Sequence, residues 1–367
     1  MRDSAIFPRA RAPYIVAACA TVLLADAGLP ILGCSGNHDR LAKTDSTTTT
    51  AAGGGGAGGA MGGAGGGTTS SSGTGGIIEP ALPTKLTVVN GIVDHDATRH
   101  CFLPYPDASG SAALPWPGVE GLPYSRGATI DPIAAVVPEE GDVELVVLGG
   151  ALAPTGGETC VDLVAAPPQG VEVRSLGVLP AATFDEQKSL LLVTTGCLGG
   201  PGHTDEALQE SVCGFGYSEQ TPTASLLGGF MSRLSEGGTQ LPLQFVHASL
   251  GLADAVMRLR PGIEGAVAPY LVTQWSYGAI APFPPSLEYA TAELVDLSLV
   301  ELHVYLSGEP EPISVVPWPA AFANSVLSLD DVTDGSGLVF VAVGPDPTVA
   351  EGSWWNGFSY AVLPADP

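Results

Sequence analysis

An internal repeat constrains the fold of this chain more than any other feature. Four pairs of segments match in the same order, and the first two pairs share a spacing of 157 residues. The pairs are LTVVNGIVDHDATRHCF (86–102) with LQFVHASLGLADAVMRL (243–259), VELVVL (143–148) with VELHVYL (300–306), SLLLVTTG (189–196) with GLVFVAVG (337–344), and 124–128 with 275–279. A period of this length indicates one structural unit that occurs twice. We therefore predict two tandem copies of one domain.

The repeated segments have the composition of β-strands. They are short, rich in Val, Ile and Leu, and bounded by Gly, Pro and Asp. The predicted strands cover 86–89, 143–148, 190–194, 243–247, 300–306 and 338–343. Only ASLLGGFMSRL (224–234) favours a helix, which its Gly pair weakens. The predicted fold class is all-β, with two tandem immunoglobulin-like antiparallel β-sandwich domains.

The N-terminus has the layout of an export signal. Arg2, Arg9 and Arg11 precede an apolar run, YIVAACATVLLA (14–25), whose length is typical of signal peptides. These 12 residues are too few to span a bilayer, which takes about 20. The segment ILGC (31–34) that follows resembles the bacterial lipobox, so Cys34 is the predicted site of lipidation.

A second cleavage site competes with the lipobox, because Ala25-Asp26-Ala27 fits the small-x-small rule for ordinary secretion. Cysteine parity favours the lipobox. Removal of the signal segment leaves Cys34 and four further cysteines, so an unlipidated chain would carry an odd thiol. We predict a lipid-anchored, extracytoplasmic protein of the bacterial cell envelope, in the outer membrane. Plain secretion remains the alternative.

The segment after the lipobox contains nothing that can form a core. From residue 35 to about 76 it is polar and then almost entirely Thr, Ala, Gly and Ser. We predict a disordered tether with an r.m.s. reach of about 35 Å. The predicted organisation is a signal peptide (1–33), the tether (34–81), β-sandwich repeat 1 (82–225), a connector (226–239) and β-sandwich repeat 2 (240–367).

The charge balance excludes one class of partner. The chain has 13 Lys and Arg against 38 Asp and Glu, a net charge of −25. Nucleic acid and anionic lipid surfaces repel a protein this acidic. We therefore expect no nucleic-acid partner.

Two motifs of the repeat carry a family resemblance. FVHAS (245–249), with a short turn and AVMRL (255–259) after it, resembles the opening motif of the domain-of-unknown-function 4397 family of bacterial cell-surface proteins. VVNG (88–91) fits the asparagine variant of that opening, and 337–344 resembles the family's closing strand. The family's Pro-Asp-Ala turn and the Asp of its second strand are absent. The resemblance implies a fold and a compartment, and it implies no catalytic residues.

Four cysteines lie in the globular part, all of them in the first repeat. Export to an oxidising compartment favours their pairing. Of the three connectivities that four cysteines allow, we predict Cys101 with Cys160 and Cys197 with Cys213. A site that binds a metal through all four cysteines would need clustered spacing such as C-x-x-C, which the sequence lacks. We therefore predict disulfides and no metal.

Other candidate sites each have an ordinary structural explanation. Asp94-His95-Asp96, with His100 nearby, contains metal-capable side chains, yet Asp and His are also common in turns. The segment DDVTDGSG (330–337) has the acidic character of a calcium loop, but it lacks the final Glu of an EF-hand and equally marks a tight turn. For both segments we favour the turn.

Two histidines in predicted strands are further candidates. His247 and Ser249 lie two apart and share a face, as a base and a nucleophile would, but no G-x-S-x-G motif accompanies them. We expect a structural role for this pair and for His303. The aromatics comprise Trp116, Trp275, Tyr277 and Trp318, which we expect in cores or interfaces, and Trp354 and Trp355, a hypothetical exposed surface for sugars or a partner protein.

These observations favour a binding protein over an enzyme. The sequence has no phosphate loop, H-E-x-x-H motif or dinucleotide fingerprint, and no apparent set of nucleophile, base and orienting group. We expect no cofactor, and a role in binding, adhesion or envelope organisation with a surface protein or a glycan as partner. The alternative from another class is an extracytoplasmic hydrolase with its site between the two repeats.

Overall fold

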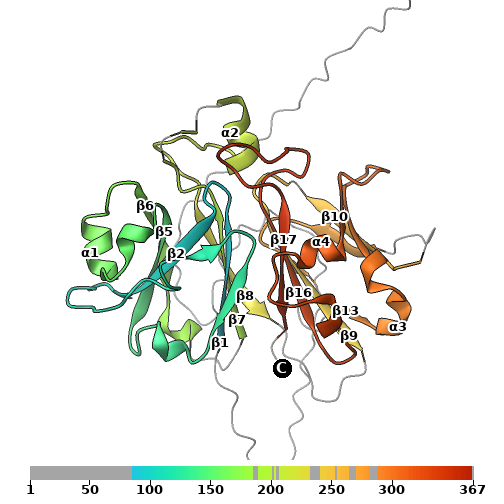
Figure 1. Ribbon diagram of the computed structural model, residues 1–367, viewed down its shortest axis with the longest axis horizontal. Helices are drawn as coiled ribbons and strands as arrows, with labels where there is room; N and C mark the ends of the chain where they lie inside the picture. The colour runs from blue at the N-terminus through green and yellow to red at the C-terminus, as the bar shows by residue number, and fades with distance from the viewer. Residues whose placement is uncertain are drawn as a thin grey trace, which may run out of the picture. The chain divides into compact units, whose positions relative to one another are not determined.

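The computed structural model describes residues 85–365 except 185–188, 201, 204–205, 232–239, 253, 264–269 and 282–286. The described part is mostly strands, with a few short helices (Figure 1). The signal peptide, Cys34 and the tether lie outside the described residues. In the part of the chain that is described, no helix is long and apolar enough to cross a membrane.

The first copy consists of two four-stranded sheets. We call β4-β1-β7-β8 its inner sheet and β3-β2-β5-β6 its outer sheet. The strands are β1 (Lys85–Ile92), β2 (Ala97–Tyr105), β3 (Leu122–Pro123), β4 (Gly127–Ile130), β5 (Asp142–Gly150), β6 (Val171–Leu179), β7 (Ser189–Gly196) and β8 (Ser225–Met231). Its helices are α1 (Cys160–Ala165) and α2 (Glu206–Cys213), and its 3-10 turns are η1 (Ile133–Ala135), η2 (Ala153–Thr155) and η3 (Ala181–Thr183).

The second copy has the same plan. Its inner sheet has the order β12-β9-β16-β17 with β13 also paired to β9, and its outer sheet has the order β11-β10-β14-β15. The strands are β9 (Leu241–Ala248), β10 (Ala255–Arg260), β11 (Tyr270–Trp275), β12 (Ile280–Ala281), β13 (Leu287–Tyr289), β14 (Glu301–Leu306), β15 (Ser314–Pro317), β16 (Leu338–Val343) and β17 (Ser359–Pro364). The helical elements are α3 (Thr291–Leu294), η4 (Leu297–Leu299), α4 (Trp318–Phe322) and η5 (Leu329–Asp331).

Strand register confirms the internal repeat and the all-β fold class. Residues that match in the sequence occupy matching positions in the ladders. Equivalent cross-strand pairs are Phe102–Leu145 and Leu259–Leu302 in antiparallel ladders, and Leu86–Leu190 and Leu243–Leu338 in parallel ones. Among the described strands, the predicted antiparallel pairing fails only for β1 with β7 and for β9 with β16. In each copy the chain passes through the outer sheet between these two strands, so no hairpin makes them antiparallel.

One predicted correspondence is shifted by two residues. Val89 pairs with Gly127 in the first copy, and the matching Val246 pairs with Ile280 in the second. Gly127 therefore corresponds to Ile280 and not to Gly278, which the sequence alignment had placed opposite it. The preceding strand has the same offset of 153 residues, because Thr98 pairs with Leu122 and the matching Ala255 pairs with Trp275, so the difference in length between the copies lies before β3 and β11.

Each copy encloses its own apolar core between its two sheets. In the first copy this core includes Leu86 and Val88 of β1, Phe102 of β2, and Leu190 and Leu192 of β7. The larger core of the second copy contains Phe245 and Phe340, whose rings stack with centroids 5.4 Å apart, together with Met257, Trp275 and Trp318. The sandwich prediction is thereby confirmed.

A third apolar layer lies between the two copies, which we call the inter-sandwich layer. Val89 and Val193 of the first inner sheet pack with Val246, Val341 and Leu363 of the second. The inner strands β1, β7, β9 and β16 are consequently buried on both faces. In Figure 1 the two inner sheets lie between β2, β5 and β6 on one side and β10 on the other. A Cβ on Gly127 would collide with the Leu363 side chain, so glycine allows this close approach.

The predicted helix over 224–234 is wrong, because these residues include strand β8, which pairs with β7 over seven residue pairs. The predicted repeat boundary at 225 therefore falls at the start of a strand of the first copy. Leu226 and Phe230 pack on the first core, whereas Leu227 and Met231 pack on the inter-sandwich layer. Burial on alternating faces, with Gly229 close against Ile280, favours the strand over the helix that the local pattern suggested.

Both predicted disulfides are present. Cys101–Cys160 links β2 to α1 with Cα atoms 5.7 Å apart, and Cys197–Cys213 joins the end of β7 to α2 with Cα atoms 5.3 Å apart. All four cysteines are fully buried. Two such bridges are compatible with an extracytoplasmic location, because oxidising compartments preserve disulfides.

Val341→Ala tests the inter-sandwich layer. We expect the variant to lower the free energy of unfolding by about 2 kcal/mol, because it removes buried methyl groups and leaves a cavity. Val315→Ala on β15, where the side chain is 44% exposed, is the control and should change it by less than about 0.5 kcal/mol. Urea unfolding followed by circular dichroism measures both, and equal stabilities for the two variants would contradict the packing of the inner sheets.

Candidate ligand-binding site

The candidate site lies where two loops of different copies meet, at one end of the inner strands. The turn after β1 carries Asp94 and His95, and residues 344–358 connect β16 to β17. Asn356 joins the two loops. Its backbone N–H donates to the carbonyl of Val93 at 2.8 Å, and its side-chain amide donates to the carbonyls of Val93 and His95 at 3.0 and 3.2 Å. One asparagine thereby holds the second copy's loop on the first copy's turn.

A groove of about 470 Å³ opens beside this junction. Both copies contribute to its walls, and carboxylates, tryptophans and small residues predominate among the residues that line it. They are Asp94, His95, Asp96, Ala97, Glu120, Gly150 and Leu152 from the first copy, and Glu351, Gly352, Ser353, Trp354, Trp355 and Asn356 from the second. Two predicted candidate segments that lie 258 residues apart in the chain, 94–96 and 354–355, thus belong to one groove.

Trp354 and Trp355 are half-buried in the groove wall and do not form a flat platform. Their rings lie 4.7 Å apart at an interplanar angle of 69°, so they form an aromatic corner. Trp354 also stacks on His203 with centroids 4.2 Å apart, and the indole N–H of Trp355 donates to the carbonyl of Ala350 at 2.9 Å. These contacts hold both rings in place before any ligand arrives.

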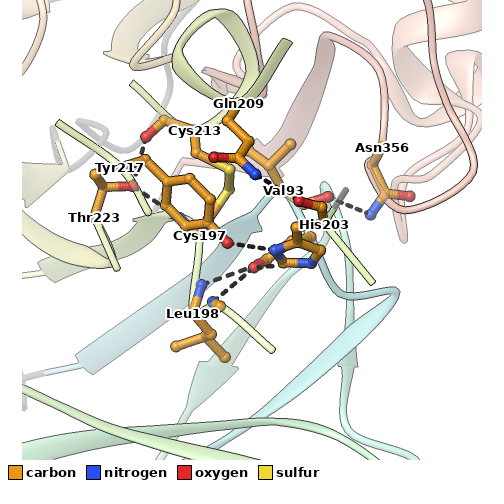
Figure 2. The surroundings of a disulfide bond; sticks show 11 residues. Val93, Cys197, Leu198, His203, Gln209, Cys213, Tyr217, Thr223 and Asn356 are labelled. Atoms are coloured by element: carbon orange, nitrogen blue, oxygen red, sulfur yellow. Dashed lines mark hydrogen bonds and ion pairs between the residues drawn. A yellow bond between two sulfur atoms is a disulfide. The ribbon is translucent and has the colours of Figure 1, made fainter. Parts of the chain in front are cut away.

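A buried polar network supports Trp354, which stacks on its member His203. Figure 2 shows His203 together with Tyr217 and Leu198. His203 Nδ1 makes a short hydrogen bond with the Tyr217 hydroxyl, and Nε2 lies 3.7 Å from an Asp94 carboxylate oxygen. His203 belongs to the segment closed by the Cys197–Cys213 disulfide, and Tyr217 follows it four residues after Cys213; Figure 2 shows the disulfide beside both side chains. Burial lowers the pKa of His203 although Asp94 raises it, and burial raises the pKa of Tyr217.

Asp94 serves as a structural acceptor. Its two carboxylate oxygens accept the backbone N–H groups of Leu198 and Gly199 at 3.0 and 2.8 Å. Burial raises the pKa of Asp94 to about 6, against the lowering effect of these N–H groups and of His203. The predicted preference for a turn over a metal site at 94–96 agrees with this use. Among the described residues, no three His, Cys, Asp or Glu side chains are grouped as metal ligands would be.

The two neighbouring histidines have different environments. His95 lines the groove, its Nε2 has no hydrogen-bond partner in the described structure, and burial lowers its pKa. His100 is fully buried in β2, 6.2 Å from the ring of Trp116, and burial lowers its pKa to about 3. His100 is therefore a neutral core residue, whereas the half-buried His95 contributes to the groove wall with its Nε2 turned away from solvent.

The acidic segment at 330–337 uses its carboxylates within the fold. Asp331 accepts from the backbone N–H and the hydroxyl of Ser328, and Asp334 accepts from the backbone N–H and the hydroxyl of Thr291. These bonds cap a 3-10 turn and tie the segment to α3. The arrangement is the turn that we favoured, and the carboxylates do not converge on a common point for calcium.

The remaining predicted candidates are structural. Ser249 is fully buried and donates its hydroxyl to the carbonyls of Gly344 and Pro345, while His247 packs 4.8 Å from the ring of Trp275. They therefore do not form a base and nucleophile pair. His303 Nε2 lies 2.8 Å from Glu301 on the outer sheet. Trp275 and Trp318 are core residues, Trp116 packs on the first core, and Tyr277 is 36% exposed.

Sequence reasoning missed His203, Tyr217, Glu120 and Glu351. His203 and Tyr217 lie near the Cys197–Cys213 disulfide. The two cysteines were the only feature of the local sequence that indicated a rigid structure around these side chains. The two glutamates carry no motif, and only the folded chain brings them to one groove. A comparison with models of protein families found no match, and a comparison with curated proteins found none either.

Asp94→Ala should lower the free energy of unfolding at neutral pH by about 2 to 4 kcal/mol, because two buried N–H groups lose their acceptor. Asp94→Asn should lower the free energy of unfolding by less, since the side-chain carbonyl of Asn still accepts one of the two N–H groups. Asp107→Ala is the matched control, because Asp107 accepts the backbone N–H of Ser109 at an exposed position. Denaturant unfolding measures all three, and equal effects of Asp94→Ala and Asp107→Ala would contradict the buried network.

A comparison of the wild type with Asp94→Asn also tests the pH dependence of stability. The folded chain binds a proton at Asp94 more tightly than the unfolded chain, since the pKa is raised from 3.8 to about 6. The stability of the wild type relative to Asp94→Asn should therefore be greatest below about pH 4, fall as the pH rises to about 6, and stay level above that. A difference that increases over this interval would have the wrong sign.

Proposed function

We propose that this protein is an extracytoplasmic lipoprotein, anchored to the outer membrane through Cys34 and related to the domain-of-unknown-function 4397 family, that binds a surface glycan in the groove between its two copies and catalyses no reaction. One observation carries the proposal. Trp354 and Trp355 are held half-exposed in a groove that also offers exposed carboxylates. Sugars commonly bind where an aromatic face adjoins a few polar groups.

The architecture supports a tethered binding role. The two disulfides suit an exported domain, and the predicted tether has a reach of about 35 Å, which would hold the groove away from the lipid surface. A surface protein is the alternative ligand, and adhesion and envelope organisation are both roles that binding in this groove would serve.

Trp355→Ala tests the groove as a glycan site. We expect an immobilised glycan array to identify binding by the wild type, and the variant to lose about ten-fold or more in affinity, because truncating an aromatic anchor costs about 2 kcal/mol. Trp355→Phe should retain part of the binding. Phe215→Ala is the control, because Phe215 is 71% exposed and outside the groove. Full binding by Trp355→Ala would count against this site.

Cys34→Ser tests the anchor. The wild type should sediment with the membrane fraction and have the mass of a chain that begins at an acylated Cys34, whereas the variant should be soluble because a lipid chain supplies the membrane affinity. Intact mass spectrometry without and with reduction measures both the N-terminus and the four paired cysteines. A mature chain that begins at residue 28 would instead establish ordinary secretion.

A hydrolase is the second candidate, and a specific observation favours it. Asp94 has a pKa raised to about 6 and lines a groove that also contains Glu120 and Glu351. Glycosidases use a protonated carboxyl and a second carboxylate. Against this role, both oxygens of Asp94 already accept backbone hydrogen bonds. Release of reducing ends from a bound oligosaccharide, lost in Asp94→Asn, would identify an enzyme.

A further inference from the structure

The charge of the groove restricts its ligand further. Residues 82–367 contain 8 Lys and Arg and 33 Asp and Glu, so 8 − 33 = −25 and the globular part carries the entire net charge of the chain. Four carboxylate residues line the groove, and no Lys or Arg is among the residues that line it. A groove with one sign of charge concentrates ligands of the opposite sign.

Three of these carboxylates are free to act on a ligand. Asp96, Glu120 and Glu351 are exposed, and in the described structure their carboxylates take part in no hydrogen bond or ion pair. Arg99 attracts Glu120, but its guanidinium is buried and donates to the carbonyls of Pro115, Pro117 and Thr155. The rim of the groove therefore has unpaired negative charge.

The aromatic geometry suits a cation better than a flat, neutral ring. A planar sugar platform needs a broad open face, whereas Trp354 and Trp355 meet at 69° and one of them already stacks on His203. The two indoles pack edge-to-face, and the part of each ring face that stays exposed to the groove attracts an ammonium group through its π-electrons. Carboxylates around such a corner strengthen the same preference.

We propose that the groove binds a saccharide that carries protonated primary amines. Its ammonium groups lie against the aromatic corner and the rim carboxylates, and the C–H face of its ring covers the exposed part of Trp355. This inference rests on the proposed function, because it names the ligand class of the same groove. The carboxylates come from three separate segments, around Asp96, Glu120 and Glu351, which suits a chain of sugars with an amine on each ring.

Isothermal titration calorimetry with two matched oligosaccharides tests the inference. The glucosamine hexamer carries amines, and its fully N-acetylated counterpart has the same backbone without charge. In mildly acidic buffer we expect the full-length protein to bind the amine form about ten-fold more tightly, and added salt to weaken only that form. A lysine hexapeptide is the third probe and should bind more weakly than the glucosamine hexamer.

Charge variants separate this inference from the proposed function. The double variant Glu120→Gln/Glu351→Gln should lose about ten-fold in affinity for the amine form and keep its affinity for the acetylated form. Glu309→Gln, at an exposed site in the turn after β14, should change neither. Thermal unfolding monitored by circular dichroism checks that each variant is folded.

The outcomes are distinct. Equal affinity for the two oligosaccharides, both lost in Trp355→Ala, would overturn the cationic ligand and leave glycan binding intact. Tighter binding of the lysine peptide would overturn the saccharide and retain the preference for a cation. Binding of none of the three probes would overturn the inference and count against glycan binding as well.

Discussion

The inter-sandwich layer is the contact on which the rest of the structure depends. The two inner sheets pack through Val89, Val193, Val246 and Val341, so each inner strand is covered on both faces. Because β1 and β16 meet in this layer, the ends of these strands lie together, and a Cβ on Gly91 would collide with Val343. The turn after β1 and the loop after β16 are therefore neighbours. The groove between the copies is thus a consequence of the apolar packing in the inter-sandwich layer.

Polar groups then make the groove rigid. Asp94 and His203 are buried, and their partners are backbone N–H groups and the Tyr217 hydroxyl. A buried polar group without partners is costly, so the segment closed by the Cys197–Cys213 disulfide is held against the turn after β1. Trp354 stacks on the outer side of this network. The wall of the groove is thus prepared for a ligand, while its charged rim stays in water.

Most of the fold could be predicted because strand patterns are local. Matching segments such as 86–102 and 243–259 share the same short β-rich runs and turn residues, and they occupy matching places in the ladders. The predicted compartment favoured disulfides, and the connectivity predicted among the three possible ones, Cys101 with Cys160 and Cys197 with Cys213, is the one present. The prediction failed at β8, because the composition around Leu226 and Leu227 favours a helix. In the folded chain Leu226 packs on the first core and Leu227 packs on the inter-sandwich layer, so the two side chains lie on opposite faces of a strand.

The groove could be predicted only in pieces. The sequence singled out the 94–96 turn and the Trp354–Trp355 pair, each from its own composition, and offered no reason to join them. Their meeting depends on apolar contacts between residues more than 150 positions apart, and so do the roles of His203, Glu120 and Glu351. Short β-rich runs and turn residues are enough to specify strands and their order, because those signals lie within a few residues. The functional surface was decided by long-range burial, because only the packed sheets bring the loops and their charges together.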